Sequence, residues 1–385
     1  MKKSILAIVI AVMMVAACAI GISAGRCDSA FAAANFSLIK EYTEADLGTK
    51  TMRAFCVDPN GKYYFGGNLH GGPTMYKFDA KTGDMLGSYQ FTVDEGSYIK
   101  GLGADDRGYV YNGIANAAND GAFFFSILNM DTMEEQSYVE VKIEGKIGVN
   151  GIGVANVGGT YYCYVMTNYD TDRLYRFDVT DVKAPKMDTT FGEGGYIDMA
   201  AKYSFDDCNG VGVDTNGYIY VTGLKQGGEG KADTFMKLNA DGSLVEEVAL
   251  ANGWNVEVFD DEYVVVSTRG GADSKVYVID SDVMEPIAEF APTADAQGFS
   301  GAGIMNNKIY VCDHGDPDRV FVSDAFAITE KAAEVETTAE EVVDAVVTDT
   351  AVSDTTTAPK TFDAAIIAAV AAVVSAAGYM VSKKH

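Results

Sequence analysis

Two histidines far apart in this chain lie in similar segments rich in glycine and proline. His70 lies in NLHGGP and His314 in CDHGDPD, and the only other histidine is His385. Imidazole is a common metal ligand and a general acid or base near neutral pH. Two such side chains at corresponding positions could share a metal ion or a substrate. The alternative is that both are solvated turn residues.

An aromatic residue with polar neighbours forms a second candidate group. Trp254, the only tryptophan, precedes Asn255, and Arg269 follows in a later loop. An indole in a loop can stack against a ring-shaped ligand such as a sugar. The alternative is that it covers the end of a packed strand. We therefore predict a ligand-binding set of His70, Trp254, Asn255, Arg269 and His314.

No catalytic residue can be identified from motifs. The sequence contains no G-x-S-x-G, H-E-x-x-H or Walker pattern, which would indicate a nucleophile, a zinc site or a phosphate loop. Its many Gly-x-Gly fragments fall in apolar runs, so we interpret them as glycines that permit close packing. These patterns favour a binding protein over an enzyme.

A recurrent unit predicts how these residues are positioned. AFCVDPNGKYYFGG at 54–67 and GVGVDTNGYIYVTG at 210–223 share an apolar run, an Asp-x-x-Gly turn and a second run rich in Tyr and Val. Gly and Asn accept positive φ, so each turn predicts a hairpin. Later runs such as TMYKFD alternate in polarity, as half-buried strands do. Units about 45–60 residues apart, each with four antiparallel strands, predict a β-propeller.

We predict an all-β fold, a six-bladed β-propeller over residues 35–329. The units open near residues 52, 100, 150, 209, 254 and 300. The last unit has three clear strands, and SLIKEYTE at 37–44 is expected to supply the fourth, which would close the ring. A seventh, degenerate blade is the alternative.

The expected blade topology places the candidate residues at one end of the ring. The loop that enters the innermost strand and the loop between the second and third strands lie on the same face of a propeller. Besides the predicted set, the entering loops offer the polar residues Lys100, Asn150, Asn209 and Ser300. Loops held by a rigid scaffold are where binding residues concentrate.

The N-terminus has the pattern of an export signal. Met1-Lys2-Lys3 precedes a long apolar run, and small residues follow up to Ala34. This pattern predicts a secretory signal peptide over residues 1–34. The alternative is a lipoprotein signal, because VAAC at 15–18 resembles a lipobox and Cys18 would then be lipidated.

The C-terminus has the pattern of a linker and an anchor. Residues 330–361 are rich in Glu, Thr, Val, Ala and Asp, which predicts an extended linker. Residues 362–385 contain an apolar run followed by lysines, which predicts a transmembrane helix. This tail resembles the cell-wall sorting signals of Gram-positive bacteria, in which Pro359, Lys360 and Thr361 match Pro-x-Thr. The resemblance implies cleavage after Thr361 and attachment to the wall, and the alternative is a retained membrane anchor.

The amino-acid composition limits the classes of partner that the protein could bind. Lys and Arg number 29 against 55 Asp and Glu, a formal net charge of −26. This balance argues against nucleic acid, which needs clustered cations, and suits a soluble exported protein. Some of the carboxylates could bind a divalent cation such as calcium. Cys56, Cys163 and Cys312 lie in apolar runs, which predicts buried core residues.

The segments GVGVDTNGYIYV and NADGSL resemble the repeats of NHL and gluconolactonase-like propellers over residues 50–326. The second family implies a divalent cation near the central channel, with Asn150, Asn209 and Asp313 as its ligands here. It also implies a metal-dependent lactonase, hydrolase or lyase. Our first expectation is an extracellular, surface-anchored module that recognises a host or cell-surface protein, a glycan or a small molecule. The metal-dependent enzyme is the alternative.

Overall fold

The apolar runs form strands, and the segments between them form tight turns. The computed structural model describes residues 34–48, 52–68, 72–92, 97–116, 120–227, 230–315 and 318–325. Four sequence predictions lie outside these residues: His70, the linker, the sorting tail, and all but the last residue of the signal segment.

The Asp-x-x-Gly segments form the predicted hairpin turns. In the first unit, the Gly61 N–H donates to the Asp58 carbonyl at 2.9 Å, and the Asn60 N–H donates to the Asp58 carboxylate at 2.8 Å. Gly61 has a φ of 77°, a left-handed conformation that glycine adopts without steric cost. Glycines 108 and 217 donate in the same way to the carbonyls of the aspartates three residues before them.

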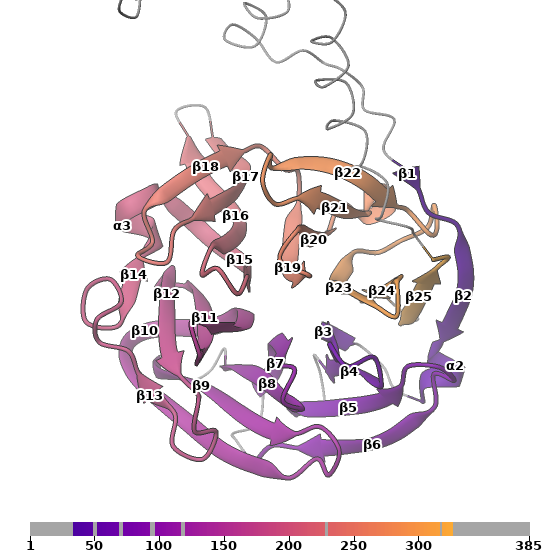
Figure 1. Cartoon of the computed structure of the whole chain (residues 1–385), viewed down its shortest axis with the longest axis horizontal. Coiled ribbons are helices and arrows are strands. Elements are labelled where there is room, and N and C mark those ends of the chain that lie inside the picture. Colours follow the sequence, from indigo (N-terminus) through magenta and orange to yellow (C-terminus); the bar gives the residue numbers. More distant parts are fainter. Residues whose placement is uncertain are drawn as a thin grey trace, which may run out of the picture. The chain divides into compact units, whose positions relative to one another are not determined.

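Within the described residues, the strands pair into five sheets arranged as a ring (Figure 1). The first sheet contains β3 (Met52–Val57), β4 (Tyr63–Asn68), β5 (Thr74–Asp79) and β6 (Met85–Gln90). The second contains β7 (Ser97–Ala104), β8 (Tyr109–Asn116), β9 (Asp120–Asn129), β10 (Glu135–Val157), β11 (Thr160–Tyr169), β12 (Arg173–Asp178) and β13 (Lys186–Met187), and β14 (Tyr196–Asp198) also pairs with β12.

The other sheets continue the ring. The third contains β15 (Phe205–Val213), β16 (Ile219–Gly227), β17 (Gly230–Leu238) and β18 (Leu244–Val248). The fourth contains β19 (Gly253–Phe259), β20 (Tyr263–Thr268), β21 (Val276–Asp280) and β22 (Glu285–Phe290), and the fifth contains β23 (Phe299–Met305), β24 (Lys308–Asp313) and β25 (Arg319–Ser323). The short helices are α2 (Glu44–Leu47), α3 (Met199–Tyr203) and the 3₁₀ helix η1 (Gly271–Asp273).

The long strand β10 joins two of the predicted units into one sheet. Its first part pairs with β9 and its second part, from Ile147, pairs with β11. The register with β9 shifts between Lys142 and Lys146, and Gly145 there has a φ of 93°. The strand bends at this shift and continues instead of ending in a turn. Four separate strands per unit, as the sequence predicts, would instead have divided this segment into two strands.

The chain closes the ring with strands from both of its ends, as predicted. β2 (Leu38–Thr43) pairs antiparallel with β25, and β1 (Ala34–Asn35) pairs parallel with β22. The innermost strands β3, β7, β10, β15, β19 and β23 contact one another in an unbroken cycle. Closure covers strand edges that would otherwise be free to pair with another chain.

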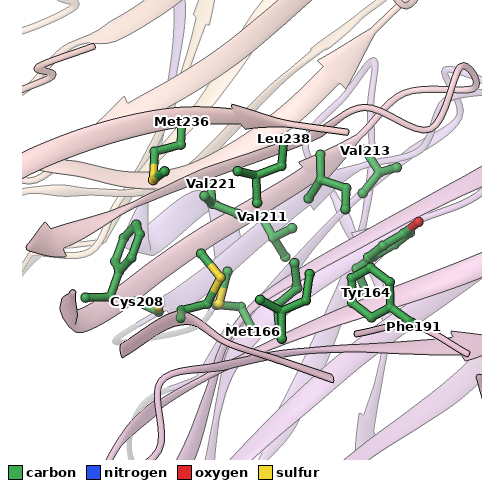
Figure 2. Close-up of a cluster of buried hydrophobic side chains, with 14 of the residues drawn as sticks. Tyr164, Met166, Phe191, Cys208, Val211, Val213, Val221, Met236 and Leu238 are labelled. Carbon is green, nitrogen blue, oxygen red and sulfur yellow. The ribbon is translucent and has the colours of Figure 1, made fainter. Parts of the chain in front are cut away.

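Hydrophobic side chains fill the spaces between neighbouring sheets. In one such cluster, Tyr164 and Met166 of β11 pack with Val211 of β15 and Met236 of β17 (Figure 2). Cys208 belongs to the same cluster. The cysteines Cys56, Cys163, Cys208 and Cys312 are free and buried, which confirms the predicted core role of the three in apolar runs.

Glycines of the inner strands allow these strands to approach one another. A Cβ atom on Gly151 would lie 2.8 Å from the backbone nitrogen of Val211, and one on Gly301 would lie 2.7 Å from the carbonyl oxygen of Phe55. Both distances are shorter than van der Waals contact, so side chains at these positions would push the sheets apart. This confirms the packing role predicted for the Gly-x-Gly fragments.

None of the helices described is long and apolar enough to cross a membrane.

Candidate functional site

Each innermost strand has a β-bulge near the start of its pairing with the next strand along the chain. The pairing register shifts at the same place in all six units, and in β15 it also shifts at Asp206. A bulge carries one extra residue, bends the strand and redirects a side chain. The residues at these bulges, which we call the bulge ring, are Arg53, Lys100, Asn150, Asn209, Trp254 and Ser300.

The asparagines of the bulge ring connect neighbouring inner strands. The Asn150 side-chain nitrogen donates to the Cys208 carbonyl at 2.7 Å, and that of Asn209 donates to the Gly253 carbonyl at 3.0 Å. Their Oδ1 atoms, and that of Asn255, are buried and accept no hydrogen bond. An unpartnered buried acceptor costs about 1–3 kcal/mol. These oxygens can therefore receive a hydrogen bond from a bound hydroxyl or coordinate a cation.

Cations from three sheets converge on Trp254. The Arg269 guanidinium carbon lies 4.2 Å from the indole centroid, and Arg53 and Lys100 each lie 5.6 Å from it. Lys100 is also 4.9 Å from the ring of Tyr169. The negative face of an aromatic ring attracts such cations. The indole thus holds a cluster of like charges at one end of the channel.

No carboxylate forms an ion pair with this cluster in the described part of the chain, although the charge of Asp207 acts on Lys100 in the direction that raises its pKa. Arg53, Lys100 and Arg269 form no ion pair there. Burial, and then the charge of Arg53, lowers the pKa of Lys100 to about 7. The same two causes lower the pKa of Arg269 to about 10. An incoming anion would relieve this repulsion.

His314 positions one of these cations. Its Nε2 accepts from Arg269 at 2.5 Å, and its Nδ1 donates to the Gly298 carbonyl at 2.8 Å. Burial lowers the pKa of His314, and the charge of Arg269 adds to this effect. The imidazole is therefore neutral and both of its nitrogens are engaged. It orients Arg269 and has no free lone pair for a metal ion.

The structure brings together part of the predicted set. Arg269 contacts both Trp254 and His314, and Asn255 is buried beside Trp254. His70 lies outside the described residues, so its predicted proximity to His314 stays a prediction.

The three residues that the family resemblance implies as metal ligands have different surroundings in the structure. Asn150 and Asn209 belong to the bulge ring, but the buried Asp313 carboxylate accepts from Arg319 at 2.7 Å and from the backbone of Gln297 and Gly298. Asp313 is thus engaged within the structure. Among the described residues, no group of three or more His, Cys, Asp or Glu side chains could hold a metal ion.

Sequence reasoning missed Arg53 and did not include Lys100 in the predicted set. Aligning the units would have identified both, because MRAF, IKGL, VNGI, CNGV, GWNV and FSGA place the bulge residue at the same register. The signal that identifies them is the position of each residue within the repeat, and not its residue type.

The other end of the channel is lined by apolar side chains and by a few polar residues, which include Glu257, Asp260 and Asn306. A cavity of about 200 Å³ is lined by Val57, Ile152, Val213 and Val256, and by Glu257. The Val57 N–H donates to Glu257 Oε1 at 3.4 Å, and Oε2 has no partner. Burial raises the pKa of Glu257 to about 8. The carboxyl group is therefore largely protonated at neutral pH.

Antiparallel sheets whose innermost strands surround a common channel define a β-propeller. The all-β propeller prediction is confirmed in this coarse form by the strand pairing and the cycle of inner strands.

No protein-family model matches this sequence, and no curated protein matches it. Many solved structures are similar to it, including the following two. The WD40 domain of Pan2 from Neurospora crassa has a TM-score of 0.46 at 10% identity, over 76% of this chain and 96% of that one. The β-propeller domain of Cps50 (Swd1) from Myceliophteria thermophila has a TM-score of 0.45 at 9% identity, over 76% of this chain and 100% of that one.

Proposed function

We propose that this protein is a recognition module that binds a ligand at the bulge ring. One observation carries the proposal: Arg53, Lys100 and Arg269 converge on Trp254 without forming an ion pair within the described residues. Buried like charges are unfavourable unless they are compensated, so such a cluster has a binding role more readily than a structural one. The ligand is a small molecule, a glycan, or a group on a host or cell-surface protein.

We propose that the propeller has six blades, as in the NHL and gluconolactonase-like families that the repeats resemble. If the first part of β10 is assigned to the blade that contains β9 and its second part to the blade that contains β11, the eight-stranded sheet divides into two blades. The hydrophobic clusters support this count, because one lies between each pair of neighbouring units, including the pair joined by β10. The bulge in each innermost strand supports it as well.

We propose that the module is displayed outside a bacterial cell. The support is in the sequence: an export signal over 1–34, an acidic linker over 330–361, and a tail similar to a cell-wall sorting signal. Deleting residues 358–385 is expected to release the protein into the medium. Retention of the deleted form on cells would contradict attachment through this tail.

An array of glycans and surface proteins tests the recognition function. The purified protein is expected to bind a defined subset of the array, and Trp254→Ala is expected to abolish that binding. Lys225→Gln is the matched control, because Lys225 is already paired with Glu247 at 2.8 Å. Binding that Trp254→Ala leaves unchanged, or an array with no hits for the wild type, would count against the proposal.

The unpartnered Oδ1 atoms of Asn150 and Asn209 also support the second candidate, a metal-dependent lactonase, hydrolase or lyase. Amide oxygens are suitable ligands for calcium and other hard divalent cations. Metal analysis of the purified protein tests this candidate. A stoichiometric divalent cation that is lost in Asn209→Leu would favour the enzyme, and protein free of metal would favour the recognition module.

A further inference from the structure

We propose that the bulge ring is a site for a sugar acid, a polyhydroxylated ring that carries a carboxylate. Its carboxylate would lie between Arg53, Lys100 and Arg269, and its hydroxyls would donate to the asparagine oxygens of the ring. This inference rests on the proposed recognition function and specifies the chemistry of its ligand.

Apart from the Arg269 N–H that donates to His314, the contacts of these cations with Trp254 leave their hydrogen-bond donors available. Trp254 attracts them through its π face, an interaction that uses no N–H group. Arg53 Nε is buried and donates to no atom in the described structure. Arginine and lysine donors of this kind form strong, charge-assisted hydrogen bonds to an oxyanion.

Several other cations of this acidic chain are paired with neighbouring carboxylates, while the buried Lys77 and Lys237 donate to backbone carbonyls. Arg176 lies 2.7 Å from Asp188, and Lys275 lies 3.0 Å from Glu289. The chain has 29 cationic residues against 55 acidic ones, so carboxylates are abundant. A cluster that forms no ion pair with a carboxylate of the described residues is therefore suited to binding an anion.

The asparagines distinguish a sugar acid from a simple anion. Asn150, Asn209 and Asn255 are 5%, 6% and 8% exposed, and each has an unpartnered Oδ1. An acceptor of this kind needs a donor, which a fully ionised oxyanion such as sulfate lacks and a sugar hydroxyl provides. Donors for a carboxylate and acceptors for hydroxyls thus occur together on the bulge ring and on Asn255 and Arg269 beside it.

Calorimetric titration of the purified full-length protein tests the inference. The probes are glucuronate, its neutral methyl ester, glucose, sulfate and tetraglutamate, all at constant ionic strength set with sodium chloride. We expect glucuronate to bind at least tenfold more tightly than each of the others. Lys100→Met and Arg269→Gln are each expected to weaken glucuronate binding at least tenfold, and Lys225→Gln to leave it unchanged.

Several results would overturn the inference, and they separate it from the proposed function. Equal binding of glucose, the methyl ester and glucuronate would leave a recognition module without an oxyanion site. Tighter binding of sulfate or tetraglutamate would assign the cations to a different anion. No binding of glucuronate would reject the sugar acid, while the array would still test recognition. If Arg269→Gln does not fold, as judged by circular dichroism, Lys100→Met decides the result.

Discussion

The guanidinium of Arg269 lies 4.2 Å from the centroid of the Trp254 ring. Arg269 follows the second strand of its sheet and Trp254 is the bulge residue of the innermost strand, so the contact spans one end of a single sheet. The sequence analysis expected the indole to stack against a ligand. In the structure its partners are cations, and its role is to hold them at the mouth of the channel.

Replacing Trp254 is expected to reduce both stability and binding. Trp254→Ala removes the aromatic face that attracts three cations, each interaction being worth about 0.5–2 kcal/mol, and it also removes buried apolar area. We expect the free energy of unfolding to fall by about 2–4 kcal/mol, and Trp254→Phe to recover part of this loss. Urea denaturation measures the free energy of unfolding of both variants. Equal stability of Trp254→Ala and the wild type would refute the role assigned to the indole.

Lys100 is expected to make stability rise with pH in the ligand-free protein. The folded state holds the pKa of Lys100 at about 7, below the usual value of 10.5, because of burial and the charges of Arg53 and Arg269, which the nearby Asp207 only partly offsets. Between these pH values the unfolded chain binds more protons, so unfolding becomes less favourable as pH rises.

Lys100→Met should remove this dependence and stabilise the protein at pH 6 by about 1 kcal/mol or more, since each pKa unit corresponds to about 1.4 kcal/mol. Thermal unfolding of the two proteins at pH 6 and pH 9 measures the effect. A variant that is less stable than the wild type at pH 6 would contradict it.

Glu257 is expected to have the opposite effect at the other end of the channel. Burial raises its pKa from 4.5 to about 8, so the folded state binds more protons than the unfolded chain between these values. The contribution of this carboxyl group to the free energy of unfolding is therefore fully present below about pH 4.5, and it is lost as pH rises through about 8.

Glu257→Gln keeps the shape of the side chain but cannot ionise. We expect it to be more stable than the wild type at pH 8.5 by about 1 kcal/mol or more, and similar to it at pH 5. Glu246→Gln, at an exposed position, is the matched control. If the difference between wild type and Glu257→Gln is the same at both pH values, the carboxyl group is not held neutral by burial.

Closure of the ring by β2 is expected to be essential for a soluble fold. A protein that begins at residue 45 lacks β2 and leaves the edge of β25 free to pair with other chains. We expect a lower melting temperature and aggregation, detected by light scattering during heating. A protein that begins at residue 37 lacks only β1 and is the matched control. Monomeric behaviour of the shorter protein would show that closure through β2 is dispensable.

The parts of the fold that depend on local chemistry could be predicted from the sequence. Asp58 and Gly61 form their turn through contacts within four residues, so the hairpins were evident from the repeats. The pairing of β2 with β25 followed from counting strands in the last unit. The continuity of β10 was missed because four separate strands were assigned to each unit, and a strand shared by two units does not follow from the repeat.

The site was harder to predict because its contacts join separate strands. Asp313 has the residue type of a metal ligand, but its carboxylate is paired with Arg319. His314 resembles a catalytic residue, but Arg269 donates to its Nε2. Neither partner can be identified from spacing. Arg53 could have been found, because it shares its register in the repeat with Asn150 and Asn209.

The most direct test of the account is a crystal of the protein soaked with selenate, an oxyanion that can be located by its anomalous scattering. We expect a selenate peak on the channel axis, within hydrogen-bond distance of donors from Arg53, Lys100 and Arg269, and displacement of that peak by glucuronate. Selenate bound only at surface lysines, with none at the bulge ring, would contradict the claim that these cations form an anion site.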